Sequence, residues 1–293
     1  MKNNCNNIKK IVVIGLSGES VFLNIDHFNN DGETIKAISK KIEPGGKGYN
    51  QAIALGKLGA EVSFITVLGN DNYREECIRV LRNHNVKEYI IDKDIPSSYA
   101  VIVVDKNANN NVIVYTGASS CVTFADVLKY KNVIDEADIV LIQNEYPEEL
   151  TKEIIDYCYD KEKIIVFNPA PKCGLDYNTL CKVTYITPNE FELSQLRCYN
   201  DLKVICTLGG LGVKFIDLNN EKLYPACNVK AIDTTGAGDI FNAGLCYMLS
   251  LNKDIDECIK FAICCSGYAV TKSGVIDSIP TYDEVIKVMK SFK

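Results

Sequence analysis

The 293-residue sequence has little of what metal centres require. It contains only two histidines, His27 and His84, and its thirteen cysteines include no C-x-x-C pair. The ligand spacing typical of a structural zinc site is therefore missing. We interpret the scattered cysteines as reduced thiols that pack as small hydrophobic side chains in a cytoplasmic protein.

Long apolar runs and basic clusters are missing as well. No run approaches the roughly 20 apolar residues of a membrane span. The short run after the first lysines is interrupted by glycine and is too short for a signal peptide. The net charge is −6, and no dense Lys/Arg block offsets it, which argues against a nucleic-acid or anionic-membrane partner.

What the sequence does contain is an alternation of short β-branched runs and amphipathic segments. The runs lie at 11–15, 62–69, 138–142, 163–168, 183–187 and 203–209. The expected helices are 47–58, 73–83, 147–159, 189–198, 239–250, 254–271 and 281–291. Continuously apolar strands indicate a parallel sheet covered on both faces. The alternation predicts a single α/β domain over 1–293, a doubly wound, mostly parallel sheet flanked by helices.

Two segments, approximately 17–43 and 97–117, interrupt this alternation. Both contain strand-like pieces without a helix between them, and the second holds an Asn-rich stretch between two apolar runs, typical of a hairpin. We predict that together they form a small β-sheet that projects from the domain as a lid over a binding site. Such an edge is also able to pair with a second copy in a homodimer, the alternative being a monomer.

The stretch AIDTTGAGDIFNAG, residues 231–244, places Gly236, Ala237 and Gly238 directly before an amphipathic helix. A helix N-terminus offers unpaired N–H groups, and glycine lets the backbone approach an anion closely. Asp239, at the same helix start, is placed to accept a proton from an attacking hydroxyl. The structural alternative is a tight turn with Asp239 as a helix cap.

A second glycine-rich segment, PGGKGYNQAIALGKLGA at 44–60, also leads into an amphipathic helix. It is not a P-loop, because Lys47 is followed by Gly48 and Tyr49 rather than by Ser or Thr. The first strand is followed by Gly15-Leu-Ser-Gly18, which does not match a dinucleotide-binding fingerprint.

With these two segments in this order, the chain resembles the ribokinase/PfkB family of carbohydrate kinases over nearly its full length. GGKGYNQA and DTTGAGDIFNAG are similar to the two family signatures, and NPAP, TPNE and TLGGLG follow in family order between them. The resemblance implies transfer of the γ-phosphate of ATP to a hydroxymethyl group of a sugar. Asp239 would be the base, and the N–H groups of Gly236, Ala237 and Gly238 the anion hole.

The resemblance also implies where the ligands bind. The ATP residues by position are Asn189, Thr207, Gly209, Gly210, Gly212 and Gly238. Glu192 would help to bind the Mg²⁺ that accompanies ATP. The alternative is that Glu192 is only an exposed carboxylate at the start of a helix. The family often uses a monovalent cation such as K⁺. Its ligands by position would be Asp233, Thr235, Ala269, Lys272, Gly274 and Ser278.

On the acceptor side the sequence departs from ribokinases. The residues expected there are Gly18, Ser20, Gly46, Lys47, Gly48, Tyr49, Asn50, Glu145 and Asp239. Ser20 stands where ribokinases carry an aspartate that binds sugar hydroxyls, and Tyr49 replaces a small residue. A Tyr49 ring that lines the pocket would favour a nucleoside acceptor. Glu145 also reads as a cap of the helix after it. A non-catalytic ATP- or sugar-binding regulator is the remaining alternative.

Overall fold

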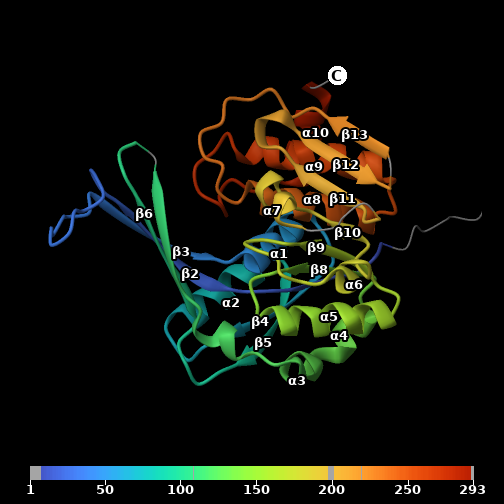
Figure 1. Ribbon diagram of the computed structural model, residues 1–293, viewed down its shortest axis with the longest axis horizontal. Helices are drawn as coiled ribbons and strands as arrows, with labels where there is room; N and C mark the ends of the chain where they lie inside the picture. Colours follow the sequence, from blue (N-terminus) through green and yellow to red (C-terminus); the bar gives the residue numbers. More distant parts are fainter. Residues whose placement is uncertain (1–7, 108, 197–200, 219, 292–293) are drawn as a thin grey trace, which may run out of the picture.

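The computed structural model describes residues 8–107, 109–196, 201–218 and 220–291. It contains a large sheet with helices on both faces and a smaller sheet at one side (Figure 1). The large sheet has nine strands in the order β13-β12-β11-β10-β9-β8-β1-β4-β5. Its strands are β1 Ile11–Ile14, β4 Val62–Leu68, β5 Val86–Asp92, β8 Ile139–Gln143, β9 Ile164–Asn168, β10 Tyr185–Ile186, β11 Val204–Thr207, β12 Val213–Asp217 and β13 Asn220–Tyr224.

The helices cover the two faces of this sheet as two separate apolar layers. They are α1 Lys47–Leu58, α2 Tyr73–Asn83, α3 Phe124–Val127, α4 Lys131–Glu136, α5 Glu148–Asp160, α6 Tyr177–Leu180, α7 Glu190–Gln195, α8 Ala237–Ser250, α9 Ile255–Ala269 and α10 Tyr282–Ser291. Because neighbouring strand residues point to opposite faces, Ile11 of β1 packs with α1, α8 and α9, whereas Val12 packs with α5. The predicted doubly wound, mostly parallel architecture is confirmed.

Three strands lie where no strand was predicted. β5 pairs in parallel with β4 at one edge, and β12 and β13 form an antiparallel hairpin at the other. β13 is exposed at all but its last residue, so the continuous apolar run that indicates a buried strand is missing there. The helix expected at 189–198 is shorter: α7 ends at Gln195, and 197–200 lie outside the described residues.

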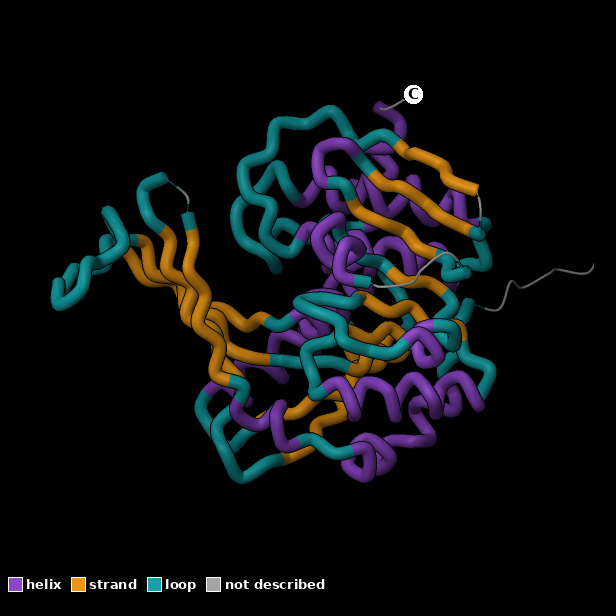
Figure 2. Tube along the Cα trace, viewed as in Figure 1, coloured by secondary structure: helices purple, strands orange, loops and turns teal. Residues whose placement is uncertain are grey.

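The small sheet is built from the two interrupting segments and projects from the main body (Figure 2). Its strands are β2 Gly18–Asn24, β3 Ser39–Gly45, β6 Ser98–Val104 and β7 Asn110–Tyr115, in the order β3-β2-β6-β7. β6 and β7 form the expected antiparallel hairpin, whereas β2 and β6 run in parallel. We call this sheet the lid; β3 leads directly into α1.

Candidate active site

The two glycine-rich segments meet, because α1 and α8 begin side by side (Figure 1). Gly46, before α1, has φ 99°, and Gly236, before α8, has φ 74°. These left-handed conformations favour glycine and turn the chain into each helix. Both turns therefore need glycine for backbone reasons, independently of any ligand.

Asp239 lies in the first turn of α8 and is only 6% exposed. Its Oδ2 accepts a hydrogen bond from Nδ2 of Asn50 at 2.9 Å, and its Oδ1 accepts one from Nε2 of Gln51 at 3.0 Å. Burial raises the pKa of the Asp239 carboxyl, while the charge of Lys47 and the two amide bonds oppose that rise. The carboxylate is thus held in one orientation and accepts a proton more readily than an exposed aspartate.

Gln51 is completely buried and orients this carboxylate through further amides. Its Oε1 accepts a hydrogen bond from Nε2 of Gln143 at 2.6 Å, and its Nε2 also lies 3.4 Å from Oδ1 of Asn168. Gln143 and Asn168 are the last residues of β8 and β9, so the carboxyl ends of two central strands fix the position of Gln51.

A second branch of buried polar groups reaches the start of α8 from the other side. Nδ2 of Asn168 donates to the Thr187 carbonyl at 3.0 Å, and the Thr187 hydroxyl donates to Oδ1 of Asn242 at 2.6 Å. Nδ2 of Asn242 then donates to the Gly238 carbonyl at 2.9 Å. Sequence reasoning quoted the motifs that contain Gln51, Asn168, Thr187 and Asn242 but assigned these residues no role, and it missed Gln143.

Lys47 and Glu145 face each other beside Asp239. The Lys47 backbone N–H donates to Oε2 of Glu145 at 2.8 Å. Burial raises the pKa of Glu145 to about 7, against the opposing charge of Lys47. Burial also disfavours the charge of Lys47, but Asp239, Glu145 and Glu192 outweigh it and raise the Lys47 pKa. Glu145 does not cap the following helix, because α5 begins after Pro147 without a side-chain cap.

Tyr49 is placed differently from the sequence expectation. Its side chain is 0% exposed, its ring packs edge-on against Phe64 at 6.3 Å, and its hydroxyl donates to the Cys77 carbonyl at 3.3 Å. The ring therefore belongs to the core beneath α1 and does not line the pocket. The interpretation of Tyr49 as a surface for a nucleobase is wrong.

Gly18 and Ser20 lie on β2, where the lid joins the main body. A Cβ on Gly18 would lie 2.7 Å from the Ser98 carbonyl oxygen, and one on Gly45 would clash with the Ser20 hydroxyl. Gly48, inside α1, leaves no room for a Cβ either, because it would lie 2.8 Å from the Gly15 backbone. The glycines at this junction are required by close packing.

A cavity of about 610 Å³ adjoins the start of α8. All six residues predicted to bind ATP line it: Asn189, Thr207, Gly209, Gly210, Gly212 and Gly238. The rest of the wall is mostly apolar and includes residues to which sequence reasoning assigned no role, Ala226, Cys227, Val229, Ala231, Phe241, Ile263 and Val270. The predicted set is thus brought together in one place.

The three backbone N–H groups predicted to form the anion hole lie at the start of α8. The N–H of Ala237 donates to the Thr234 carbonyl at 3.2 Å, whereas those of Gly236 and Gly238 have no acceptor among the described residues.

Glu192 accepts from the Asn189 N–H at 2.9 Å in a reciprocal capping box at α7. Glu192 therefore caps α7, and its negative charge also helps to raise the pKa of Lys47.

Of the residues expected around a monovalent cation, Asp233, Thr235 and Gly274 are in direct contact. Oδ1 of Asp233 accepts from the Thr235 N–H at 2.9 Å and its Oδ2 from the Gly274 N–H at 3.0 Å, which ties two loops together. Burial opposes the Asp233 charge, but these N–H groups lower its pKa. The Ser278 hydroxyl donates to the Val275 carbonyl at 2.8 Å, and Lys272 Nζ lies 3.9 Å from Glu284.

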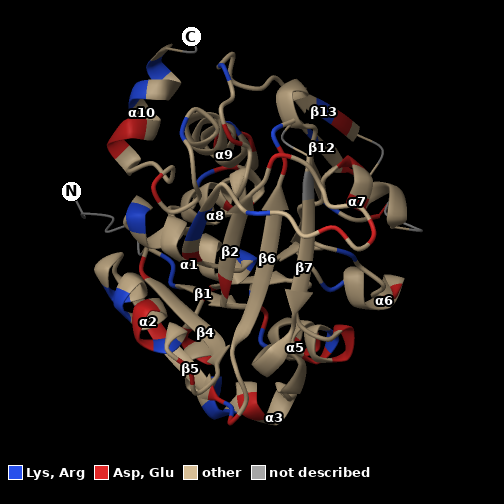
Figure 3. Ribbon diagram, turned by 90° about the vertical axis from the view of Figure 1, so that its left-hand side faces the viewer, with Lys and Arg blue, Asp and Glu red and all other residues tan. Residues whose placement is uncertain are grey.

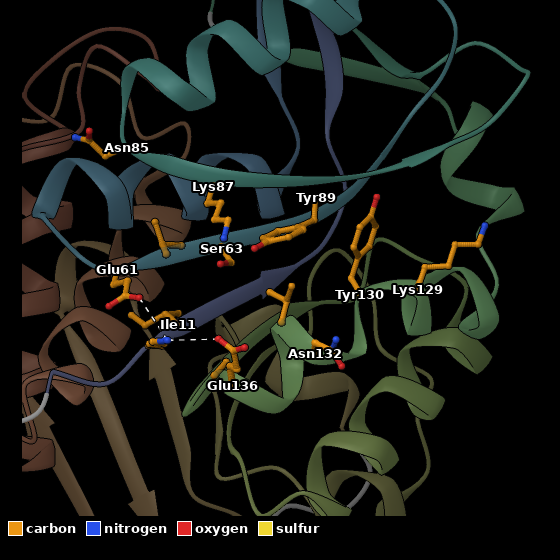
Figure 4. Close-up of a pocket in the computed structure, with 14 residues that line it drawn as sticks. Ile11, Glu61, Ser63, Asn85, Lys87, Tyr89, Lys129, Tyr130, Asn132 and Glu136 are labelled. Atoms are coloured by element: carbon orange, nitrogen blue, oxygen red, sulfur yellow. Dashed lines mark hydrogen bonds and ion pairs between the residues drawn. The ribbon is translucent and has the colours of Figure 1, made fainter.

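A second cavity, of about 510 Å³, lies at the opposite edge of the sheet, beside the amino ends of β1, β4 and β5 (Figure 4). Its Lys10 is 3.8 Å from Glu61 and 3.5 Å from Glu136, so these charges compensate one another. It contains none of the predicted site residues. The predicted ATP residue Thr207 instead ends β11, at the carboxyl ends of the parallel strands.

Comparison with known proteins decides the family. The model of the pfkB family of carbohydrate kinases matches residues 8–282. The chain belongs to this family. It is 33% identical over 292 residues to the ribokinase of Bacillus subtilis, covering 96% of this chain and 100% of that one. The kinase is also 30% identical to the ribokinase of Lactococcus lactis, over 97% and 98% of the two chains.

Solved ribokinase structures share the fold of this chain. A ribokinase from Thermotoga maritima superposes with a TM-score of 0.88 at 34% identity, covering 96% of this chain and 99% of that one. A ribokinase from Arabidopsis thaliana, solved with ribose and ATP, shares the fold at 23% identity, with a TM-score of 0.84 over 96% and 99% of the chains. This kinase is therefore an ATP-dependent carbohydrate kinase of the ribokinase type. Among its described residues, no helix is long and apolar enough to span a membrane.

Proposed function

We propose that this kinase transfers the γ-phosphate of ATP to a hydroxymethyl group of ribose or a closely related sugar, with Asp239 as the base. The observation that carries the proposal is the position of Asp239. It directly follows Gly238, which lines the 610 Å³ cavity, and its carboxylate faces Asn50 and Lys47 on the other side. The relatives at 33% and 34% identity are named ribokinases.

In the proposed reaction, ATP occupies the cavity with its phosphates at the start of α8. The free N–H groups of Gly236 and Gly238, at the positive end of the helix, stabilise the charge of the transferred group. Asp239 takes the proton of the attacking hydroxyl as the new O–P bond forms and the bond to ADP breaks. Lys47, positively charged beside Asp239 and Glu145, offsets negative charge gathered between them.

The same residues suit the two cations. Mg²⁺, bound with ATP, neutralises phosphate charge; Glu192, held by Asn189, has a second carboxylate oxygen free for a water of that ion. A K⁺ ion beside the anion hole fits the oxygen-rich loops at 233–235 and 269–278. Asp233 joins them by accepting one N–H group from each loop. Ala269 and Lys272 would contribute backbone carbonyls.

Acceptor-dependent ADP release with Mg-ATP tests the proposal. We expect turnover on ribose or a similar pentose to exceed turnover on hexoses and nucleosides by at least about tenfold in kcat/KM, one decade of transition-state discrimination. Preference for a nucleoside would contradict the acceptor assignment. No acceptor-dependent ADP on any member would leave the binding-protein alternative. Because the Tyr49 ring is buried in the core, it gives no support to a nucleoside acceptor.

We further propose that the lid pairs with the lid of a second copy. β7 is an edge strand, and Figure 3 shows β6 and β7 without Lys, Arg, Asp or Glu. Val112, Ile113 and Val114 of β7 are 53%, 68% and 58% exposed. An apolar edge of this kind, with unpaired backbone groups, is suited to a self-complementary contact.

Ile113→Lys should dissociate this dimer. A lysine in the contact would bury an unpaired charge, so we expect the dimer dissociation constant to rise at least about a hundredfold, roughly 3 kcal/mol. Sedimentation velocity at micromolar concentration measures it. The matched control is Leu223→Lys, because Leu223 is 66% exposed on β13, the edge of the other sheet. A monomeric wild type, or equal dissociation in both variants, would contradict the proposal.

Glu145→Gln should change how stability depends on pH. The Glu145 pKa is about 7, above its ordinary value of 4.5, so the folded state binds the proton more tightly than the unfolded state. The free energy of unfolding therefore falls as pH rises from about 4.5 to 7. Glutamine does not ionise, so the variant should lack this fall. We expect the free energy of unfolding of the variant, relative to that of the wild type, to be about 1–2 kcal/mol higher at pH 8 than at pH 4. Denaturant titrations of wild type, Glu145→Gln and the exposed control Glu149→Gln measure it; parallel wild-type and Glu145→Gln curves would contradict it.

A further inference from the structure

Cys227 lines the cavity of about 610 Å³ that we propose for the nucleotide, and it contacts Cys264 behind it. Cys227 belongs to the segment between β13 and α8, is half-buried and lines the cavity. Cys264 lies on α9 and is 7% exposed. Their sulfur atoms are 3.8 Å apart, within hydrogen-bonding distance for thiols. The pair is therefore open to the cavity on one side and anchored to a core helix on the other.

Cys227 packs closely against α9. A Cβ on Gly267 of α9 would lie 2.7 Å from the Cys227 Cβ, and the Cys227 sulfur is 3.7 Å from the Ile263 carbonyl oxygen. At the other end of the segment, a Cβ on Gly212 would lie 2.6 Å from the Ala226 nitrogen. Gly267, Ile263, Gly212 and Ala226 all line the same cavity. A shift of Cys227 toward α9 therefore changes the shape of the cavity wall.

The two thiols differ in reactivity. The hydrogen bond between the Cys227 and Cys264 thiols lowers the pKa of Cys227, against the opposing effect of burial. The pKa of the Cys264 thiol is raised by Cys227 and by burial, so it keeps its proton until its sulfur attacks an oxidised Cys227. The sulfur that ionises first is thus the one that lines the cavity, and the thiolate is the form that reacts with oxidants.

We propose that Cys227 and Cys264 form an oxidisable dithiol whose closure to a disulfide weakens nucleotide binding. The inference rests on the nucleotide cavity of the proposed function. The oxidant is hydrogen peroxide. The Cys227 thiolate attacks one peroxide oxygen, the O–O bond breaks, and hydroxide leaves a sulfenic acid. The Cys264 sulfur then attacks the Cys227 sulfur and displaces a second hydroxide. The two thiol protons convert both hydroxides to water, so two thiols and one peroxide yield one disulfide and two waters.

Closure has a defined geometric consequence. The sulfur separation must shrink from 3.8 Å to about 2.0 Å. Cys264 is held in the core by α9, so the Cys227 segment makes most of the movement and draws Ala226 and Val229 with it. Displaced wall atoms lose contacts with a bound nucleotide. Conversely, a nucleotide that already fills the cavity keeps peroxide away from Cys227.

Peptide mapping tests the bond itself. Wild-type protein is treated with peroxide, its remaining thiols are blocked with N-ethylmaleimide, and it is digested with trypsin without reductant. We expect residues 223–230 to be linked to 261–272, with less of the link when Mg-ADP is present. Cys264→Ser should abolish the link, whereas Cys265→Ser should retain it. No link at peroxide concentrations that oxidise the exposed Cys121 and Cys181 would overturn the proposal.

Equilibrium titration with a fluorescent adenine nucleotide tests the consequence. We expect peroxide to raise the dissociation constant of the wild type about tenfold, roughly a decade of affinity, and dithiothreitol to restore it. Cys227→Ser and Cys264→Ala should not respond, whereas Cys121→Ser and Cys181→Ser should respond as the wild type does. A linked protein with unchanged affinity would overturn the proposal. If the reduced protein binds no nucleotide, the proposed function fails, and the proposed effect on nucleotide affinity fails with it. The mapped disulfide would then show only that the two thiols oxidise.

Discussion

Asp239→Asn should lower kcat on the best acceptor by about a thousandfold, within the range of a lost general base. Asparagine has nearly the shape of aspartate but cannot take the proton. Nucleotide affinity should stay within about twofold, because the cavity wall is unchanged. Initial rates of ADP release and a nucleotide titration measure the two quantities.

The amide network makes this test specific. Asn50 and Gln51 both donate to the Asp239 carboxylate, so an asparagine leaves one buried donor without an acceptor, at a cost of about 1–3 kcal/mol. Loss of the buried charge offsets part of this cost. Asp254→Asn is the control. Asp254 caps α9 by accepting from the Glu257 N–H at 2.8 Å, and asparagine caps a helix equally well. An Asp239→Asn enzyme that keeps more than about a tenth of wild-type kcat would contradict the base assignment.

Gly236→Ala should lower kcat/KM for ATP by about a hundredfold, as expected for the loss of one donor from an anion hole. Gly236 has φ 74°, and a Cβ there would lie 2.6 Å from Cγ1 of Val275. The backbone must rotate, the loop at 275 must move, or both, and either change displaces the N–H groups at the start of α8.

Gly59→Ala separates this effect from backbone strain. Gly59 ends α1 with φ 93°, and a Cβ there would meet nothing within 4 Å. Both variants carry the left-handed penalty of about 1–2 kcal/mol, so both should lower the thermal midpoint. Only Gly236→Ala should lose activity when both enzymes are assayed well below their midpoints. Equal kinetics in the two variants would refute the anion-hole assignment.

The sequence by itself determined the fold class, and it picked out six residues that the fold places around one cavity. Continuously apolar runs predicted β1, β4, β8, β9 and β11, because parallel strands covered on both faces cannot alternate. The six predicted ATP residues line one cavity. They follow strands or begin helices, and in a parallel sheet the carboxyl ends of the strands share one edge, so sequence order alone brings them together.

Only the tertiary structure decided which side chains face the site. Every described residue of α1 from Gly48 to Leu58 is buried except Lys57, so a period of 3.6 residues cannot separate a pocket face from a core face. Tyr49 therefore turned inward, while its neighbours Asn50 and Gln51 reached Asp239 on α8. Cys227 and Cys264 likewise met only because a loop after β13 packs on α9. Local sequence patterns do not predict contacts between elements that are far apart in the chain, because these contacts depend on tertiary packing.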